Sequence, residues 1–142
     1  MLYVDTSVLA AYYSPEPLSV QVQDLLVQQV RPALSSLTEV EFFSAVAKKV
    51  RTGEIKKADA NRILAMFSSH LETNLFTVVE VKNHHWKLAR GWLSLLSTSL
   101  RTLDALHLAI ASAEDLQIVT ADKGMFQAAE DLGVECRFMK ES

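Results

Sequence analysis

The sequence contains few of the residues that cross-link or interrupt a chain. Cysteine occurs once, at Cys136, which excludes a disulfide framework within the chain and favours a reducing compartment. There are only four glycines and three prolines in 142 residues, with no low-complexity tract or repeat, so no flexible linker is indicated. We therefore expect residues 1–142 to form one domain, long enough to bury a hydrophobic core.

Long apolar runs and an excess of positive charge are also missing. No stretch approaches the roughly 20 apolar residues of a membrane span, and the N-terminus lacks the pattern of a signal peptide. We therefore expect a soluble cytoplasmic protein. The net charge of −3 argues against a generally basic nucleic-acid-binding surface, but it leaves room for a local basic patch or a bound metal ion.

Apolar residues make up 49% of the chain, and their spacing alternates between strand-like and helix-like segments. Strands are predicted over residues 2–4, 32–35, 76–81, 117–120 and 135–139. Helices are predicted over residues 6–13, 18–30, 37–51, 57–73, 84–96, 103–116 and 123–132. Strands that alternate with helices are typical of an α/β fold, with a mostly parallel sheet covered by helices on both faces.

Two predicted strands are followed closely by an aspartate. Asp5 follows the first strand and Asp122 follows the strand over 117–120. Sites in such folds gather outside the carboxyl ends of the strands, so we expect both carboxylates on one edge of the sheet. Asp104 opens a helix, where an anion is favoured by about 0.3–1 kcal/mol, so it is either a third site residue or a simple cap.

The helix over 37–51 supplies a fourth acid, but periodicity leaves two candidates. Glu39 and Glu41 are two positions apart, so they point about 160° from one another on a helix. The apolar stripe of this helix is expected at Val40, Phe43, Ala47 and Val50. Glu39 falls near an edge of that stripe, whereas Glu41 lies on a small, polar side that suits either a cleft wall or a solvated face.

Several carboxylates in one place need a positive partner. Two like charges about 4 Å apart repel by about 4 kcal/mol at an effective dielectric constant of 20, so an unaided cluster would be partly protonated at neutral pH. Mg²⁺ or Mn²⁺ prefers carboxylate oxygen, and a cation bound in this way can activate water and hold a phosphate. The acids therefore favour phosphodiester chemistry over zinc hydrolysis.

Four segments in order resemble the PIN-domain ribonucleases, and within them the VapC-type toxins of bacterial and archaeal toxin–antitoxin pairs. The segments, which span almost the whole chain, are YVDTSVL, LSSLTEVEFFSAVAKKVRTGEI, LRTLDALHLAIA and IVTADKGMFQAAEDLGV. The resemblance implies a three-layer α/β/α fold around a mostly parallel sheet of four or five strands. It also implies a metal-dependent endoribonuclease that leaves a 3′-hydroxyl and a 5′-phosphate.

The resemblance also implies which residues form the site. The catalytic and metal-binding acids correspond to Asp5, Glu41, Asp104 and Asp122, and the cofactor to Mg²⁺ or Mn²⁺. Glu41 is selected over Glu39 because Ser44 and Ala45 follow it in the family's pattern. The hydroxyl positions that support the acids by hydrogen bonds correspond to Thr6 and Thr120.

The partners implied by the family are an RNA substrate, a cognate antitoxin and a second copy of the chain. The C-terminal segment of such an antitoxin lies across the cleft and can insert an arginine near the acids. The amphipathic helices over 18–30 and 57–73 have enough apolar surface for an interface, although the core could equally take it up.

Basic and histidine side chains are the remaining candidates for the site. The densest basic stretch runs from Lys48 to Lys57 and either contacts phosphates, with Lys48 the best candidate, or forms a solvated helix face. Arg101 and Lys123 are weaker candidates. His107 is interpreted as a buried histidine of the scaffold in preference to a general base. The adjacent His84 and His85 are expected on the surface.

Two other function classes are alternatives to a nuclease. A phosphatase of the haloacid dehalogenase type needs a second aspartate two residues after the first, where this chain has Ser7. A non-catalytic binding module on the same fold would not need the complete set of acids. Cleavage of RNA with Mg²⁺ or Mn²⁺, compared with EDTA, separates the three.

Overall fold

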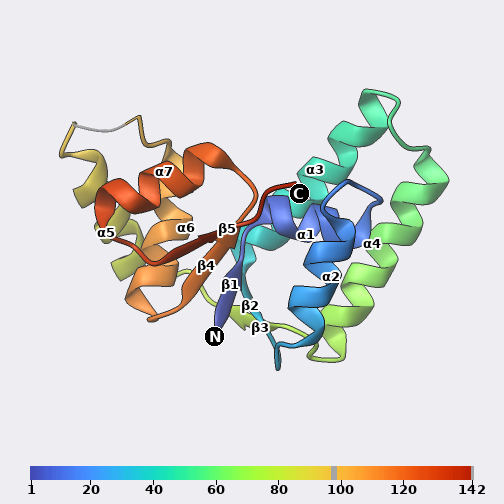
Figure 1. Cartoon of the computed structure of the whole chain (residues 1–142), viewed down its shortest axis with the longest axis horizontal. Helices are drawn as coiled ribbons and strands as arrows, with labels where there is room; N and C mark the ends of the chain where they lie inside the picture. Colours follow the sequence, from blue (N-terminus) through green and yellow to red (C-terminus); the bar gives the residue numbers. More distant parts are fainter. Residues whose placement is uncertain (97–98, 142) are drawn as a thin grey trace.

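The computed structural model describes residues 1–96 and 99–141, and its centre is a parallel sheet (Figure 1). In the described residues the strands are β1 (Leu2–Val4), β2 (Ala33–Ser35), β3 (Thr77–Val79), β4 (Gln117–Thr120) and β5 (Cys136–Phe138). The helices are α1 (Thr6–Tyr13), α2 (Ser19–Val27), α3 (Ser36–Arg51), α4 (Lys57–Glu72), α5 (Asn83–Leu93), α6 (Thr102–Ala113) and α7 (Lys123–Leu132). The strand order is β3-β2-β1-β4-β5, with every neighbouring pair parallel. The predicted α/β class is therefore confirmed, with five strands.

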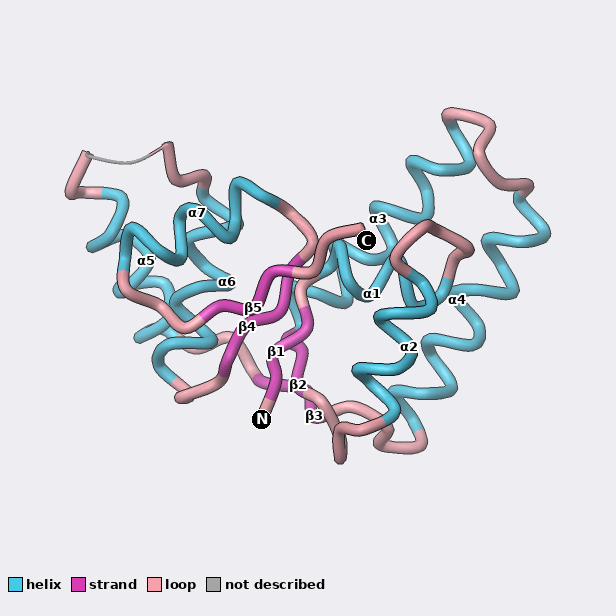
Figure 2. Tube along the Cα trace, viewed as in Figure 1, coloured by secondary structure: helices cyan, strands magenta, loops and turns pink. Residues whose placement is uncertain are grey.

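Helices cover both faces of the sheet and complete three layers. Helices α1 to α4 lie on one side, and α5 to α7 lie on the other (Figures 1 and 2). The side chains of β1 alternate between the two cores, as the pleat of a strand requires. Leu2 and Val4 pack in the cluster that includes Phe67 of α4, whereas Tyr3 packs in the cluster that includes Ile110 of α6.

Several predicted elements end earlier than the apolar pattern indicates. Helix α2 ends at Val27, where the prediction ran to residue 30, and Arg31 then adopts a left-handed backbone with φ of 53° before Pro32. Helix α5 ends at Leu93, and Leu96 is left-handed with φ of 57°. Left-handed non-glycine residues interrupt a right-handed helix, and apolar periodicity does not reveal them.

The apolar stripe predicted for α3 is wrong. Val40 and Phe43 are 69% and 42% exposed, whereas the residues of α3 that are buried are Thr38, Phe42 and Val46. The error arises because a threonine occupies the core face. Thr38 forms a capping box with Ser35 at the start of the helix, which satisfies its hydroxyl inside the protein. A stripe drawn through apolar residues alone therefore misses the buried face.

Helix α6 lies inside the protein, as its composition predicts. Every side chain from Ala105 to Ala111 is buried. In the part of the chain that the structure describes, no helix is both long and apolar enough to cross a membrane. Because α6 begins with Asp104 and carries His107 one turn later, its packing positions the site described below.

A buried histidine ties the start of α5 to the end of α6. Nδ1 of His85 accepts a hydrogen bond from the backbone N–H of Lys82 (2.9 Å), so Nε2 carries the proton and donates to Oε1 of Glu114 (3.0 Å). The side chain of His85 is fully buried, whereas that of His84 is 59% exposed. The surface placement expected for both is therefore wrong for His85. Successive helical residues point about 100° apart, so one faces α6 and the other faces solvent.

The two histidines form a matched pair for a stability test. We expect His85→Ala to lower the free energy of unfolding by about 2–4 kcal/mol, because it opens a cavity and leaves the Lys82 N–H unpaired. His84→Ala is expected to change it by no more than about 0.5 kcal/mol. Urea denaturation of both variants measures this difference. Equal losses of unfolding free energy would contradict a structural role of the buried His85.

Candidate active site

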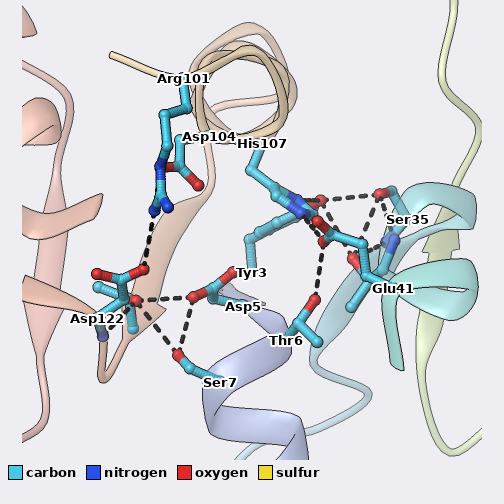
Figure 3. A network of polar contacts seen from close by, with 12 residues as sticks. Tyr3, Asp5, Thr6, Ser7, Ser35, Glu41, Arg101, Asp104, His107 and Asp122 are labelled. Carbon is cyan, nitrogen blue, oxygen red and sulfur yellow. Dashed lines mark hydrogen bonds and ion pairs between the residues drawn. The ribbon is translucent and has the colours of Figure 1, made fainter. Parts of the chain in front are cut away.

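The carboxyl edge of the sheet brings the predicted acids into one cleft. Strands β1 and β4 pair in register, and the N–H of Asp5 continues the pairing to the carbonyl of Val119 (3.1 Å). Asp122 follows β4, Glu41 lies on the helix that follows β2, and Asp104 lies in the first turn of α6. All four acids line a cleft of about 460 Å³ (Figure 3).

Asp5 is buried and is held by two hydroxyl groups. Ser7 Oγ and Thr120 Oγ1 each donate to its Oδ2 at 2.8 Å. Both hydroxyls are oriented by the backbone, because Ser7 accepts from the N–H of Ala121 and Thr120 accepts from the N–H of Asp122, each at 3.0 Å. These bonds replace the water that burial removes from the carboxylate. Ser7 was not predicted as a site residue, although a serine two positions after an aspartate can bond to it locally.

Glu41 is held in its ionised form by its neighbours. Thr6 donates to its Oε1 at 2.9 Å, and His107 Nε2 contacts the same oxygen. Burial opposes ionisation of Glu41, but the contact with His107 and the hydrogen bond from Thr6 outweigh that effect. The pKa of Glu41 is therefore lowered.

A buried network extends from Glu41 to the centre of the sheet (Figure 3). The ionised carboxylate only accepts, so His107 Nε2 donates to it and Nδ1 accepts from the hydroxyl of Tyr3 (2.7 Å). The oxygen of Tyr3 is then free to accept from Ser35 (2.8 Å). Burial raises the pKa of Tyr3, so its hydroxyl keeps its proton. His107 is the buried scaffold histidine that was expected, and the group it holds is Glu41.

Arg101 joins the other two acids of the cleft. Its Nε and Nη2 lie 3.1 and 2.9 Å from Oδ2 of Asp104, and Nη2 lies 3.4 Å from Oδ2 of Asp122. Hydrogen bonding and charge from Asp104, followed by the charge of Asp122, raise the pKa of Arg101. Burial raises the pKa of Asp104, against the lowering effect of Arg101 and with further raising by Asp122 and Asp5.

The helix cap in this cleft is Asp122. Its Oδ1 accepts from the N–H of Gly124 (2.8 Å) at the start of α7. A Cβ at position 124 would lie 3.3 Å from that oxygen, so a glycine suits the close approach. Asp104 makes no capping bond, because α6 begins after Arg101 without a side-chain cap. Asp104 is therefore not a hydrogen-bonding cap, although its place in the first turn of α6 is one where the helix dipole favours its charge.

The four acids line one cleft, but no three of them have ligand atoms within 4.8 Å of one another. Among the described residues, the one set of three or more possible metal-binding side chains with ligand atoms all within 4.8 Å of one another is His84, His85 and Glu114. That set is not suited to a metal, because both ring nitrogens of His85 are committed to Lys82 and Glu114. The acids instead line a shared hollow, where hydrogen bonds and ion pairs hold each carboxylate in place.

One carboxylate oxygen is left open on three of these acids. In Asp5, Glu41 and Asp104, all hydrogen bonds from the described part of the chain fall on a single oxygen. The other oxygen of each is a lone-pair donor beside the cleft. The donor set that lines the cleft is therefore rich in hard oxygen atoms, with Thr6 and Ser7 beside them.

The basic stretch before α4 does not line the cleft. Lys48 is exposed and is not among the residues around it, and Lys49 is paired with Glu16 (3.0 Å) and Glu54 (3.3 Å). Contact of Lys48 with RNA stays a prediction. Arg101, named from the sequence only as a weaker candidate, does line the cleft.

Comparison with solved structures shows the same fold at low sequence identity. FitAcB from Neisseria gonorrhoeae is 21% identical, with a TM-score of 0.70 over 98% of this chain and 97% of that one. The Mycobacterium tuberculosis toxin VapC20, described as cleaving the sarcin-ricin loop, is 16% identical, with a TM-score of 0.70 over 90% and 95%. VapBC2 from Rickettsia felis, bound to promoter DNA, is 18% identical, with a TM-score of 0.69 over 99% and 100%.

Comparison with curated protein sequences yields no match. A family model described as PIN domain, however, matches residues 2–131, which includes every acid of the cleft. The chain therefore belongs to the PIN domain family.

Proposed function

We propose that this protein is a metal-dependent endoribonuclease, a VapC-like toxin that hydrolyses RNA phosphodiester bonds in the acidic cleft. The observation that carries the proposal is the convergence of Asp5, Glu41, Asp104 and Asp122 from separate elements on one hollow. Membership of the PIN domain family and the fold shared with a toxin described as cleaving the sarcin-ricin loop support it.

The donor chemistry of the cleft fits Mg²⁺ or Mn²⁺. Asp5, Glu41 and Asp104 present open carboxylate oxygens, and hard dications prefer oxygen ligands. Burial raises the pKa of Asp104, and the charges of Asp122 and Asp5 raise it further, so added positive charge beside this carboxyl would compensate these effects. When bound, a dication would supply that compensation and stabilise the charge that develops on the phosphate as water attacks.

The side chains of the cleft would have separate roles in binding the cation and activating water. Asp5 would bind the cation through the oxygen that Ser7 and Thr120 leave open, and Asp104 and Asp122 would complete the oxygen set. Glu41 would orient the attacking water and accept its proton at Oε2, because Thr6 and His107 occupy Oε1. His107 and Tyr3 act as positioning residues that fix the direction of that open oxygen.

Removal of one carboxylate charge tests the mechanism. We expect Asp5→Asn to reduce RNA cleavage by at least about 100-fold, the scale of losing one electrostatic contact in the transition state. EDTA should abolish cleavage by the wild type, and Mn²⁺ should restore it. Asp24→Asn is the matched control, because Asp24 is exposed on α2 outside the cleft. Cleavage by Asp5→Asn at the wild-type rate would overturn the mechanism.

Two acids of the cleft should affect stability with opposite signs in EDTA. The pKa of Glu41 is lowered from 4.5, so its ionised form stabilises the fold above that pH, and the contribution is lost as the pH falls through the lowered pKa. The pKa of Asp104 is raised from 3.8, so its ionisation costs stability as the pH rises above that value.

The pH dependence of unfolding therefore separates the two groups. At pH 7, we expect Glu41→Gln to lower the urea midpoint and Asp104→Asn to raise it, both relative to the wild type. Both differences should shrink as the pH is lowered below about 4, the ordinary pKa range of carboxyl groups. Shifts of the same sign at pH 7 would contradict the assigned electrostatics.

An antitoxin partner is proposed for the outer surface of α2 and α4. A hollow between these helices is lined by Val27 of α2 and Met66 of α4, with Tyr12 and Tyr13 of α1, and Val27 is 81% exposed. Exposed apolar surface of this kind suits an apolar segment of another chain. The FitAB and VapBC structures that share this fold are toxin–antitoxin assemblies, some with DNA, which supports the partner class. We also propose a homodimer.

Coexpression with the small protein of the adjacent reading frame tests the partner. We expect the two to copurify and Val27→Asp to weaken their association by about tenfold or more, because it places a charge in an apolar contact. Val40→Asp is the control, since Val40 is similarly exposed on α3 outside this hollow. Copurification that is equally strong for both variants would place the partner elsewhere.

A further inference from the structure

Arg101 takes a position between two proposed metal ligands. The guanidinium makes two contacts with Oδ2 of Asp104, at 2.9 and 3.1 Å, and reaches Oδ2 of Asp122 at 3.4 Å. Figure 3 shows it extending from the start of α6 across the cleft toward Asp122. One positive group thus compensates the charges of two carboxylates, one in the first turn of α6 and one at the start of α7. A divalent cation would do the same.

The ion pairs of Arg101 with Asp104 and Asp122 have features that allow another cation to replace the arginine. The side chain of Arg101 is 70% exposed, while those of Asp104 and Asp122 are 17% and 41% exposed. Exposed ion pairs contribute little to stability, because water competes for both charges. The acids are fixed, since Asp104 lies on a buried helix and Asp122 caps α7, whereas the arginine is held by its charge contacts at the cleft mouth.

The same guanidinium supplies positive charge to the cleft that an RNA would enter. Of the described residues that line the cleft, Arg101 alone is a lysine or arginine. Its planar fork matches a phosphate as well as a carboxylate, with two parallel hydrogen bonds. A cleft lined by four acids repels a phosphodiester, and an exposed guanidinium beside the acids can offset that repulsion.

We propose that Arg101 and the divalent cation exchange at Asp104 and Asp122, and that the displaced guanidinium then binds a phosphate of the RNA. Arg101 is thus a counter-ion in the metal-free protein and a substrate-binding residue in the loaded one. The inference rests on the proposed nuclease function and adds to it the order in which charges are replaced in the cleft.

Binding of Mn²⁺ without RNA tests the exchange. Titration calorimetry of the full chain should show Arg101→Gln binding Mn²⁺ about fivefold more tightly than the wild type, because the competing exposed ion pair is gone. Arg101→Lys keeps the charge and should stay near the wild-type affinity. Arg62→Gln is the matched control, since Arg62 pairs with Asp59 at the same three-residue spacing, is 68% exposed and lies outside the cleft.

Cleavage kinetics at saturating Mn²⁺ test the phosphate contact. Arg101→Gln should raise KM for RNA about tenfold, with Arg101→Lys intermediate, because a lysine keeps the charge but loses the two-pronged hydrogen bond. Arg62→Gln should match the wild type in both measurements.

The possible failures are distinguishable. Unchanged Mn²⁺ affinity or unchanged KM in Arg101→Gln, with Mn²⁺-dependent cleavage intact in the wild type, would overturn the exchange while the nuclease function stands. A wild type that neither binds Mn²⁺ nor cleaves RNA with it would overturn the proposed function itself.

Discussion

The parallel pairing of β1 with β4 is the constraint on which the cleft depends. Their register puts the ends of the two strands side by side, and the N–H of Asp5 bonds to the carbonyl of Val119. Thr120 at the end of β4 then reaches Asp5 at 2.8 Å and also accepts from the N–H of Asp122. A shift of one residue would turn Asp5 away from this hydroxyl, because side chains alternate along a strand.

The cleft stabilises like charges close together because each carboxylate has a hydrogen-bond or ion-pair partner. Asp5 has hydroxyls, Glu41 has His107 and a threonine, and Asp104 and Asp122 share Arg101. The result is a graded set of acids, in which the pKa of Glu41 is lowered and that of Asp104 is raised. Such divergence between neighbouring carboxyls is typical of sites where each performs a separate role.

The buried polar network explains why a tyrosine stands in the first strand. Tyr3 is buried between β1 and α6, and its hydroxyl links Ser35 at the end of β2 to His107 on α6. Each member has a hydrogen-bond partner, which makes such a network rigid. The direction of Glu41 is therefore set by residues from three elements beneath the cleft.

The sequence by itself determined the alternation of strands and helices, the buried character of α6 and the placement of aspartates just after β1 and β4. These features are local, since they follow from apolar periodicity and from the position of charges relative to it. The family resemblance, and not periodicity, separated Glu41 from Glu39.

Only the tertiary structure decided which polar side chains are buried and what each one contacts. Thr38 faces the protein core from α3, where its hydroxyl meets that of Tyr3, and His85 is buried because Glu114 meets it at the end of α6. Asp122 caps α7, and the guanidinium of Arg101 contacts both Asp122 and Asp104. The partners of His85 and Arg101 lie 29 and 21 residues away in the sequence, and no pattern within one helix or strand contains that information.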